Sequence, residues 1–154
     1  MSVNGVEYLR GRDSLNGRVE LVAYDVGCPE IFCDVRDHIL SALGSTSSTL
    51  EHVGSTSVPG LASKPVIDIV LLVKDSAAEE TYIPQLEAVG FLHHLREPGW
   101  LEHRLLKHKV HQVNLQAGGS EMDFYAGLLR CQGQNDQRPS GSIPLGSHIV
   151  GGCP

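Results

Sequence analysis

No stretch of this sequence reaches the roughly 18 consecutive apolar residues that a membrane-spanning helix requires. Residues 1–13 carry early charge and contain no apolar core of the length found in secretory signal peptides. Positive charge is also scarce, because 12 Lys and Arg stand against 18 Asp and Glu, for a formal net charge of −6. We therefore expect a cytoplasmic protein without a membrane partner and without a general nucleic-acid-binding surface, although this composition is compatible with a local basic site.

The sequence also lacks the cysteine pattern of a zinc site. Its four cysteines include no CxxC pair and show no regular spacing with the histidines. At 154 residues, 41% hydrophobic and 19% charged, the chain has the length and composition of one folded domain.

One stretch, residues 50–73, combines a loop of small residues with an acid on a buried segment. It reads LEHVGSTSVPGLASKPVIDIVLLV. Gly54 and Ser55 follow a hydrophobic residue, and Asp68 comes after twelve intervening residues and opens an apolar run. The β-branched content and short length of that run favour a buried strand. A small-residue loop that can approach phosphates, followed by such an acid, is typical of a site for a nucleotide and its metal ion.

The run EHVGSTSVPGLASKPVIDI closely resembles the signature of the GrpB family, small proteins of the nucleotidyltransferase fold. The resemblance extends from about residue 19 to about residue 115 and implies a domain over residues 19–130. We expect residues 1–18 to form a loose leader, because they are polar and show no period. Residues 131–154, with five glycines, three prolines and no aromatic residue, are expected to be irregular or disordered.

The spacing of apolar residues predicts an α/β (α+β) fold, in which a mixed sheet carries helices on one face. A helix is expected from Pro29 to Leu43, ended by Gly44. A second helix is expected either from a capping box at Ser76–Glu79 or from near Pro84. The expected strands or extended segments cover residues 19–24, 50–53, 68–73, 91–95, 104–106 and 111–115.

The resemblance implies a metal site built on Asp68. In the nucleotidyltransferase fold, two carboxylates two residues apart on a strand hold divalent metal ions. Asp68 matches the first, and would be the catalytic metal anchor, but the second position holds Val70. A third acid is expected on the last strand, yet residues 113–116 contain none. Glu51 and His111 are the candidates to complete the coordination of Mg²⁺ or Mn²⁺, although histidine is a poor ligand for Mg²⁺.

The residues expected to bind phosphate are the small residues of the turn and three basic side chains. They are Gly54, Ser55, Thr56, Ser57, Lys64, Arg104 and Lys107. Gly54 lets the backbone come close to a phosphate, and Ser55 can donate its N–H and its hydroxyl. Structural alternatives stay open, because Asp68 could cap the turn by hydrogen bonds and the basic residues could lie on solvated surfaces.

Three functions are compatible with these patterns. The first is a nucleotidyltransferase-like protein that binds a nucleoside triphosphate and transfers a nucleotidyl group to a small-molecule acceptor. The second is a relative that binds a nucleotide or another ligand without transfer, which the absence of an acid at Val70 favours. The third is an accessory domain that binds a protein partner.

Overall fold

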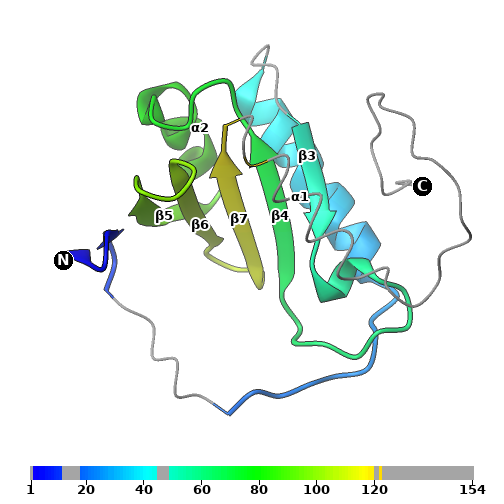
Figure 1. Ribbon diagram of the computed structural model, residues 1–154. Coiled ribbons are helices and arrows are strands. Elements are labelled where there is room, and N and C mark those ends of the chain that lie inside the picture. Colours follow the sequence, from blue (N-terminus) through cyan, green and yellow to red (C-terminus); the bar gives the residue numbers. More distant parts are fainter. Residues whose placement is uncertain (1, 12–17, 45–48, 120–121, 123–154) are drawn as a thin grey trace, which may run out of the picture.

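The computed structural model describes residues 2–11, 18–44, 49–119 and 122. Within these ranges the chain forms a seven-stranded sheet with the order β1-β2-β5-β6-β7-β4-β3 (Figure 1). The strands are β1 (Ser2–Val3), β2 (Val6–Tyr8), β3 (Thr49–Val53), β4 (Ile67–Leu72), β5 (Phe91–Glu97), β6 (His103–His108) and β7 (Val113–Gly118). Strands β4 and β7 are parallel, and the other neighbours in the sheet are antiparallel.

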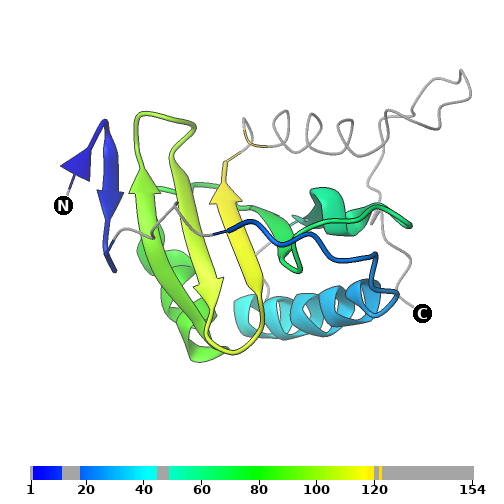
Figure 2. The same cartoon turned by 90° about the horizontal axis from the view of Figure 1, so that it is seen from below.

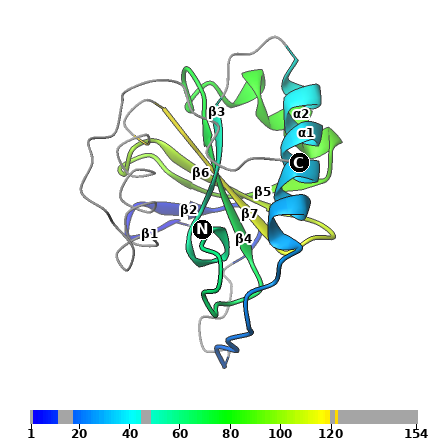
Figure 3. The ribbon, with the colours of Figure 1, turned by 90° about the vertical axis from the view of Figure 1, so that its right-hand side faces the viewer.

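Two α-helices, α1 (Cys28–Leu43) and α2 (Ile83–Ala88), cover the same face of the sheet, which we call the helix face (Figures 2 and 3). Pro29 lies in the first turn of α1, where a backbone N–H is not needed. Gly44 ends the helix with a φ of 61°. The expected mixed sheet with helices on one face is therefore confirmed. Neither helix has the length and apolar character that crossing a membrane requires, and this holds for all the described ranges.

The main core lies between the helix face and α1. Alternate residues of β4, namely Ile67, Ile69 and Leu71, point to this side and are at most 4% exposed. Phe32 and Ile39 of α1 pack into the same cluster. Each fully buried side chain of this kind contributes about 1.5–3 kcal/mol relative to an exposed one, so this core fixes β4 against α1.

A second, smaller cluster covers part of the opposite face, which we call the Asp68 face. Val53, Val70 and Met122 are each fully buried there. Gly118 allows this packing, because a Cβ at that position would lie 2.6 Å from the Cβ of Met122. Val70 is therefore a core residue rather than an open position in a metal site.

The expectation of a loose leader is wrong for residues 2–8. Strands β1 and β2 form a hairpin, and β2 pairs with β5 through Glu7–Arg96 and Tyr8–Leu95. The hairpin turns at Asn4 and Gly5, which have φ values of 52° and 81°. Positive φ at both positions is the geometry for which Asn-Gly is preferred in two-residue hairpins, so the missed signal was in the sequence.

Two further expectations changed in detail. The capping box at Ser76–Glu79 is absent, since the short 3₁₀ turn η2 (Glu79–Thr81) has no side-chain cap and α2 begins near Pro84 instead. Residues 19–24 form no strand. They contain an isolated β-bridge, in which Val22 and Ser63 exchange two backbone hydrogen bonds. The expected tail, residues 131–154, lies outside the described residues.

Candidate functional site

Asp68 is the second residue of β4 and points away from the helices. The register of the strands places Val53, Asp68, Asn114 and Lys107 in one row across β3, β4, β7 and β6. Residues in register on neighbouring strands share a face of the sheet. A carboxylate, an amide and an ammonium group therefore follow one another on the Asp68 face.

The carboxylate of Asp68 is held by Asn114. The amide nitrogen Nδ2 of Asn114 donates a hydrogen bond of 3.1 Å to Oδ1 of Asp68. Burial raises the pKa of Asp68, and it outweighs both this hydrogen bond and the positive charge of Lys64, which lower the pKa. Asp68 therefore lies in a less polar setting than a surface acid, and a positively charged ligand would stabilise its ionised form.

Gly54 brings the turn after β3 against this carboxylate. Its φ is 74° and its ψ is −171°, a backbone conformation that residues with a side chain avoid. A Cβ at Gly54 would lie 3.1 Å from Oδ2 of Asp68. Gly54 and the carboxylate of Asp68 therefore lie in direct contact.

The hydroxyl groups of this turn, η1 (Ser55–Ser57), serve different purposes. Ser57 Oγ donates to the carbonyl of Gly54 at 2.6 Å, and Thr56 Oγ1 donates to the carbonyl of Val66 at 3.0 Å. Both hydroxyls therefore fix the turn. Ser55 is exposed, and its hydroxyl makes no hydrogen bond within the described part of the chain. Of the three, Ser55 is the one able to donate to a ligand.

His52 is part of the scaffold behind the turn. Its ring stacks on Phe32 of α1 with centroids 5.0 Å apart, and its Nε2 lies 3.1 Å from Thr56 Oγ1. Burial lowers its pKa to about 4. It is therefore neutral near pH 7 and links the turn to α1.

Asp68 does not cap the turn through these hydroxyls, because Asn114 is its partner.

Two of the three expected basic residues are near Asp68. Lys64 is exposed in the loop before β4, and its charge acts on Asp68. Lys107 is half-buried and stands beside Asn114 in the row on the Asp68 face. A ligand phosphate in front of Ser55 and Asp68 would have both ammonium groups on its side of the sheet.

The expected phosphate contact from Arg104 is wrong. Arg104 pairs in register with Ala117, a helix-face core residue, and is only 4% exposed. Its Nε donates to Glu79 Oε1 at 2.6 Å, and Arg96 binds the same carboxylate at 2.5 Å. Burial alone would raise the pKa of Glu79, but the hydrogen bonds from Arg96 and Arg104 prevail and lower it to about 2. Arg104 therefore belongs to a buried ion-pair cluster on the other face.

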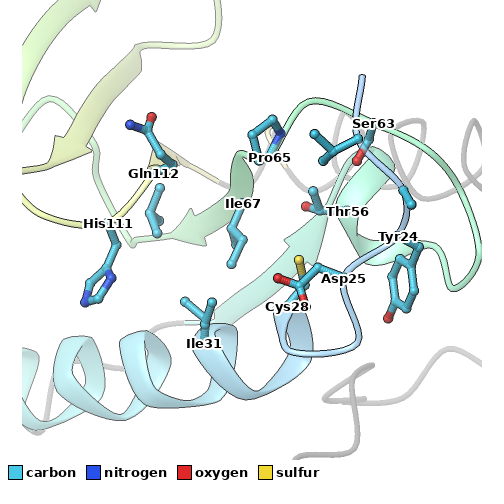
Figure 4. Close-up of a pocket in the computed structure, with 13 residues that line it drawn as sticks. Tyr24, Asp25, Cys28, Ile31, Thr56, Ser63, Pro65, Ile67, His111 and Gln112 are labelled. Carbon is cyan, nitrogen blue, oxygen red and sulfur yellow. The ribbon is translucent and has the colours of Figure 1, made fainter. Parts of the chain in front are cut away.

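The expected metal ligation by His111 is also wrong. His111 precedes β7 and stacks on His108 with ring centroids 5.0 Å apart. It lines a cavity on the helix face together with Ile67, the residue before Asp68 (Figure 4). Because successive residues of a strand point to opposite faces, His111 and Asp68 are separated by the sheet.

Glu51 shares the Asp68 face but stands opposite Val70, not opposite Asp68. Glu51 is 6% exposed. The residue directly opposite Glu51 is Val70, the residue directly opposite Asp68 is Val53, and both valines are fully buried. In the ranges that the structure describes, no group of three or more His, Cys, Asp or Glu side chains could hold a metal ion. The donor set therefore does not fit the two-metal centre that the nucleotidyltransferase fold implies.

Asn114 is the residue that the sequence analysis missed. It stands in register with Asp68 on the parallel neighbour, and Gln116 stands in register with Val70. Neither side chain is a carboxylate, so the expectation of a third acid on this strand did not include them. The alternation of polar and apolar residues in VNLQ was a signal for their shared face, but the register with β4 was not readable from the sequence.

The mixed sheet with both helices on one face defines a domain of α/β (α+β) class. The chain belongs to the GrpB family, because the family model described as GrpB protein matches residues 18–125. It is 48% identical over 111 residues to UPF0157 protein BH1888 of Halalkalibacterium halodurans, covering 70% of this chain and 57% of the relative. It is 44% identical over 105 residues to UPF0157 protein SCO7215 of Streptomyces coelicolor, covering 68% and 53%. The chain thus spans about half the length of these curated relatives.

Among solved structures, conserved protein GrpB from Enterococcus faecalis matches with a TM-score of 0.61 and 20% identity, covering 77% of this chain and 86% of that one. The structure of Cid1 in complex with its short product ApU matches with a TM-score of 0.49 and 14% identity, covering 75% and 38%. The GrpB match agrees with the family assignment and, at this identity, describes the fold alone.

Proposed function

We propose that this GrpB-family chain binds a nucleotide by its phosphates on the Asp68 face, and that it transfers nucleotidyl groups weakly or not at all. The observation that carries the proposal is the contact between Gly54 and Asp68. Gly54 has a backbone conformation that other residues avoid, and a Cβ built on it would lie 3.1 Å from Asp68 Oδ2. The exposed Ser55, the next residue, is therefore held close to this carboxylate. This arrangement suits a charged ligand, because strained backbone is concentrated at binding sites.

The ligand needs a cation between Asp68 and the phosphates, because a carboxylate and a phosphate repel each other. One carboxylate holds Mg²⁺ or Mn²⁺ weakly, so most of the ligand oxygens would come from the nucleotide and from water. We therefore propose that the divalent ion enters as the metal–nucleotide complex. Lys64 and Lys107 would offset the remaining negative charge, and Ser55 would donate to a phosphate oxygen.

Weak or absent transfer is proposed because the described ranges contain no cluster of carboxylates that could hold the metal ions that activate an attacking hydroxyl. Val70 stands at the position of the expected second carboxylate and is fully buried together with Val53 and Met122. Asn114 contributes an amide where a third carboxylate is expected. Such a site can orient a nucleotide but lacks the paired carboxylates of two-metal catalysis.

The test is calorimetric titration of the full chain with ATP, GTP, CTP and UTP, each with and without Mg²⁺ or Mn²⁺. We expect metal-dependent binding that Asp68→Asn abolishes, while Asp34→Asn, the same change on an exposed position of α1, leaves it intact. Failure of the native chain to bind any nucleotide would refute the proposal.

A transferase remains the second candidate because Glu51 lies on the Asp68 face, two residues along β3 from the direct neighbour of Asp68. Release of pyrophosphate from a nucleoside triphosphate in the presence of small acceptors measures this activity. Turnover by the native chain that Glu51→Gln abolishes would establish the transferase and replace the binding-only proposal.

A further inference from the structure

A cavity of about 140 Å³ lies on the helix face, away from Asp68 (Figure 4). Its walls come from segments far apart in the sequence: residues 22–25, the start of α1, the loop before β4 and the turn before β7. The beginnings of β4 and β7 are side by side because these strands are parallel. The cavity is therefore a product of the fold rather than of one flexible loop.

The segment before α1 forms the outer wall of the cavity. Val22 and Ser63 exchange two backbone hydrogen bonds of 2.8 and 3.0 Å, which fasten this segment to the loop before β4. The chain then turns at Asp25, whose Oδ1 accepts a hydrogen bond of 2.8 Å from the N–H of Gly27. These contacts hold Asp25 at the cavity, beside the first residue of α1.

Most of the inner surface is apolar. Ile31, Ile67 and Val113 line it, and the last two are at most 4% exposed. A dry cavity of about 150 Å³ lined by such side chains is large enough for a benzene ring. The size and the walls therefore favour a six-membered ring with one short substituent.

The charge at the cavity is negative. Asp25 forms no ion pair within the described ranges, and its carboxylate lies next to the Cys28 thiol, whose pKa is raised by burial and by the charge of Asp25. The other polar side chains that the structure places on the lining are not acidic, and some already make hydrogen bonds. Thr56 Oγ1, for example, donates to the carbonyl of Val66. A ligand that complements this lining has an apolar ring and a cationic group.

We propose that this cavity binds a small ring-bearing amine, with its ring between Ile31, Ile67 and Val113 and its ammonium group at Asp25. The site is distinct from the proposed nucleotide site, because Ile67 and Asp68 point to opposite faces of the sheet. It also stands independently of that proposal, since its ligand needs no phosphate and no metal.

The test uses benzylamine as the probe, with benzyl alcohol and benzoate as neutral and anionic molecules of similar shape. The full chain is titrated while backbone amide signals are followed by NMR. We expect saturable shifts confined to residues around the cavity, strongest for benzylamine and absent for benzoate. Alkylation of Cys28, followed by mass spectrometry, should slow as benzylamine saturates the site, because the thiol lines the same cavity.

Two variants separate the charge from the cavity. Asp25→Asn keeps an oxygen to accept the Gly27 hydrogen bond, and we expect it to weaken benzylamine binding about tenfold while benzyl alcohol binds as before. Ile31→Phe fills the cavity and should abolish binding of both, whereas Asp34→Asn should change neither. Equal binding of benzoate and benzylamine, shifts spread over the whole surface, or no effect of Asp25→Asn would overturn the proposal.

Discussion

Asp68 and Asn114 face each other across the parallel strands β4 and β7, with Asn114 Nδ2 3.1 Å from Asp68 Oδ1. An amide thus occupies the place from which a second carboxylate could bind a shared metal ion. The pair therefore gives the half-buried acid a hydrogen-bond donor instead of a second carboxylate. It also offers the most direct way to change the site.

Asn114→Asp should place two carboxylates where they can bind one divalent metal ion without a nucleotide. Two carboxylates directly opposite each other repel, so we expect the variant to lose about 1 kcal/mol of stability without metal. Mn²⁺ should restore the loss by binding between them, which thermal unfolding with and without Mn²⁺ measures. Gln116→Glu, on the same strand and face but opposite Val70, is the matched control. An equal effect of Mn²⁺ on both variants would contradict the prediction.

Gly54→Ala should reduce both stability and nucleotide binding. The φ of 74° with extended ψ costs a residue with a Cβ about 2 kcal/mol, and the methyl group would press on Oδ2 of Asp68. Gly60→Ala is the control, because Gly60 has a φ of 81° but no atom within 4 Å of a Cβ. We expect Gly60→Ala to lose stability only. Unchanged nucleotide affinity in Gly54→Ala, measured by calorimetry, would remove the turn from the proposed site.

Val70→Asp should destabilise the protein instead of completing the metal site. Val70 is fully buried against Val53 and Met122, so a carboxylate there loses its hydration, at a cost of about 3 kcal/mol or more. Urea unfolding measures the loss, and Val110→Asp at an 80% exposed position should cost little. A stable Val70→Asp variant with tighter Mn²⁺ binding would mean that Met122 moves aside readily.

Glu79→Gln should weaken the fold by about 2–3 kcal/mol at pH 7, because the buried Arg104 would lose the carboxylate at its Nε and keep only its ion pair with the more exposed Glu102. The pKa of Glu79 is lowered to about 2 in the folded chain from an ordinary value near 4.5. Its stabilising contribution is therefore complete above pH 4.5 and is lost as the pH falls toward 2.

Urea unfolding of the native chain and of Glu79→Gln at several pH values checks this. The difference between the two should shrink as the pH falls from 4.5 to 2. Glu80→Gln, an exposed neighbour, should follow the native profile. A constant difference between the native chain and Glu79→Gln down to pH 2 would show that Glu79 acts by packing alone.

Much of the fold could be predicted because its signals are local. The apolar stripe from Phe32 to Leu43 and the stop at Gly44 identified α1, and the β-branched run after Asp68 identified β4. The helix–strand order then indicated a mixed sheet. What the sequence could not provide was register, and register decides that Asn114 is the neighbour of Asp68.

The errors in the candidate site have specific physical causes. Arg104 and Lys107 are three residues apart on one strand, so the two-residue period sends them to opposite faces and they could not serve one phosphate. That conflict was already visible in the sequence. The role of Glu79 was not visible in the sequence. Glu79 was expected to cap a helix, but it forms ion pairs with Arg96 and Arg104, which lie 17 and 25 residues further along the chain.

The pairing of β2 with β5 has a consequence for synthesis of the protein on the ribosome. Residues 6–8 are made well before their partner strand, which spans residues 91–97. Strand β5 in turn needs β6 and β7 to join the sheet beside β4. The first hairpin therefore has no edge to join until most of the domain has left the exit tunnel, and its docking, with the Glu7–Arg96 ion pair, comes among the last steps of folding.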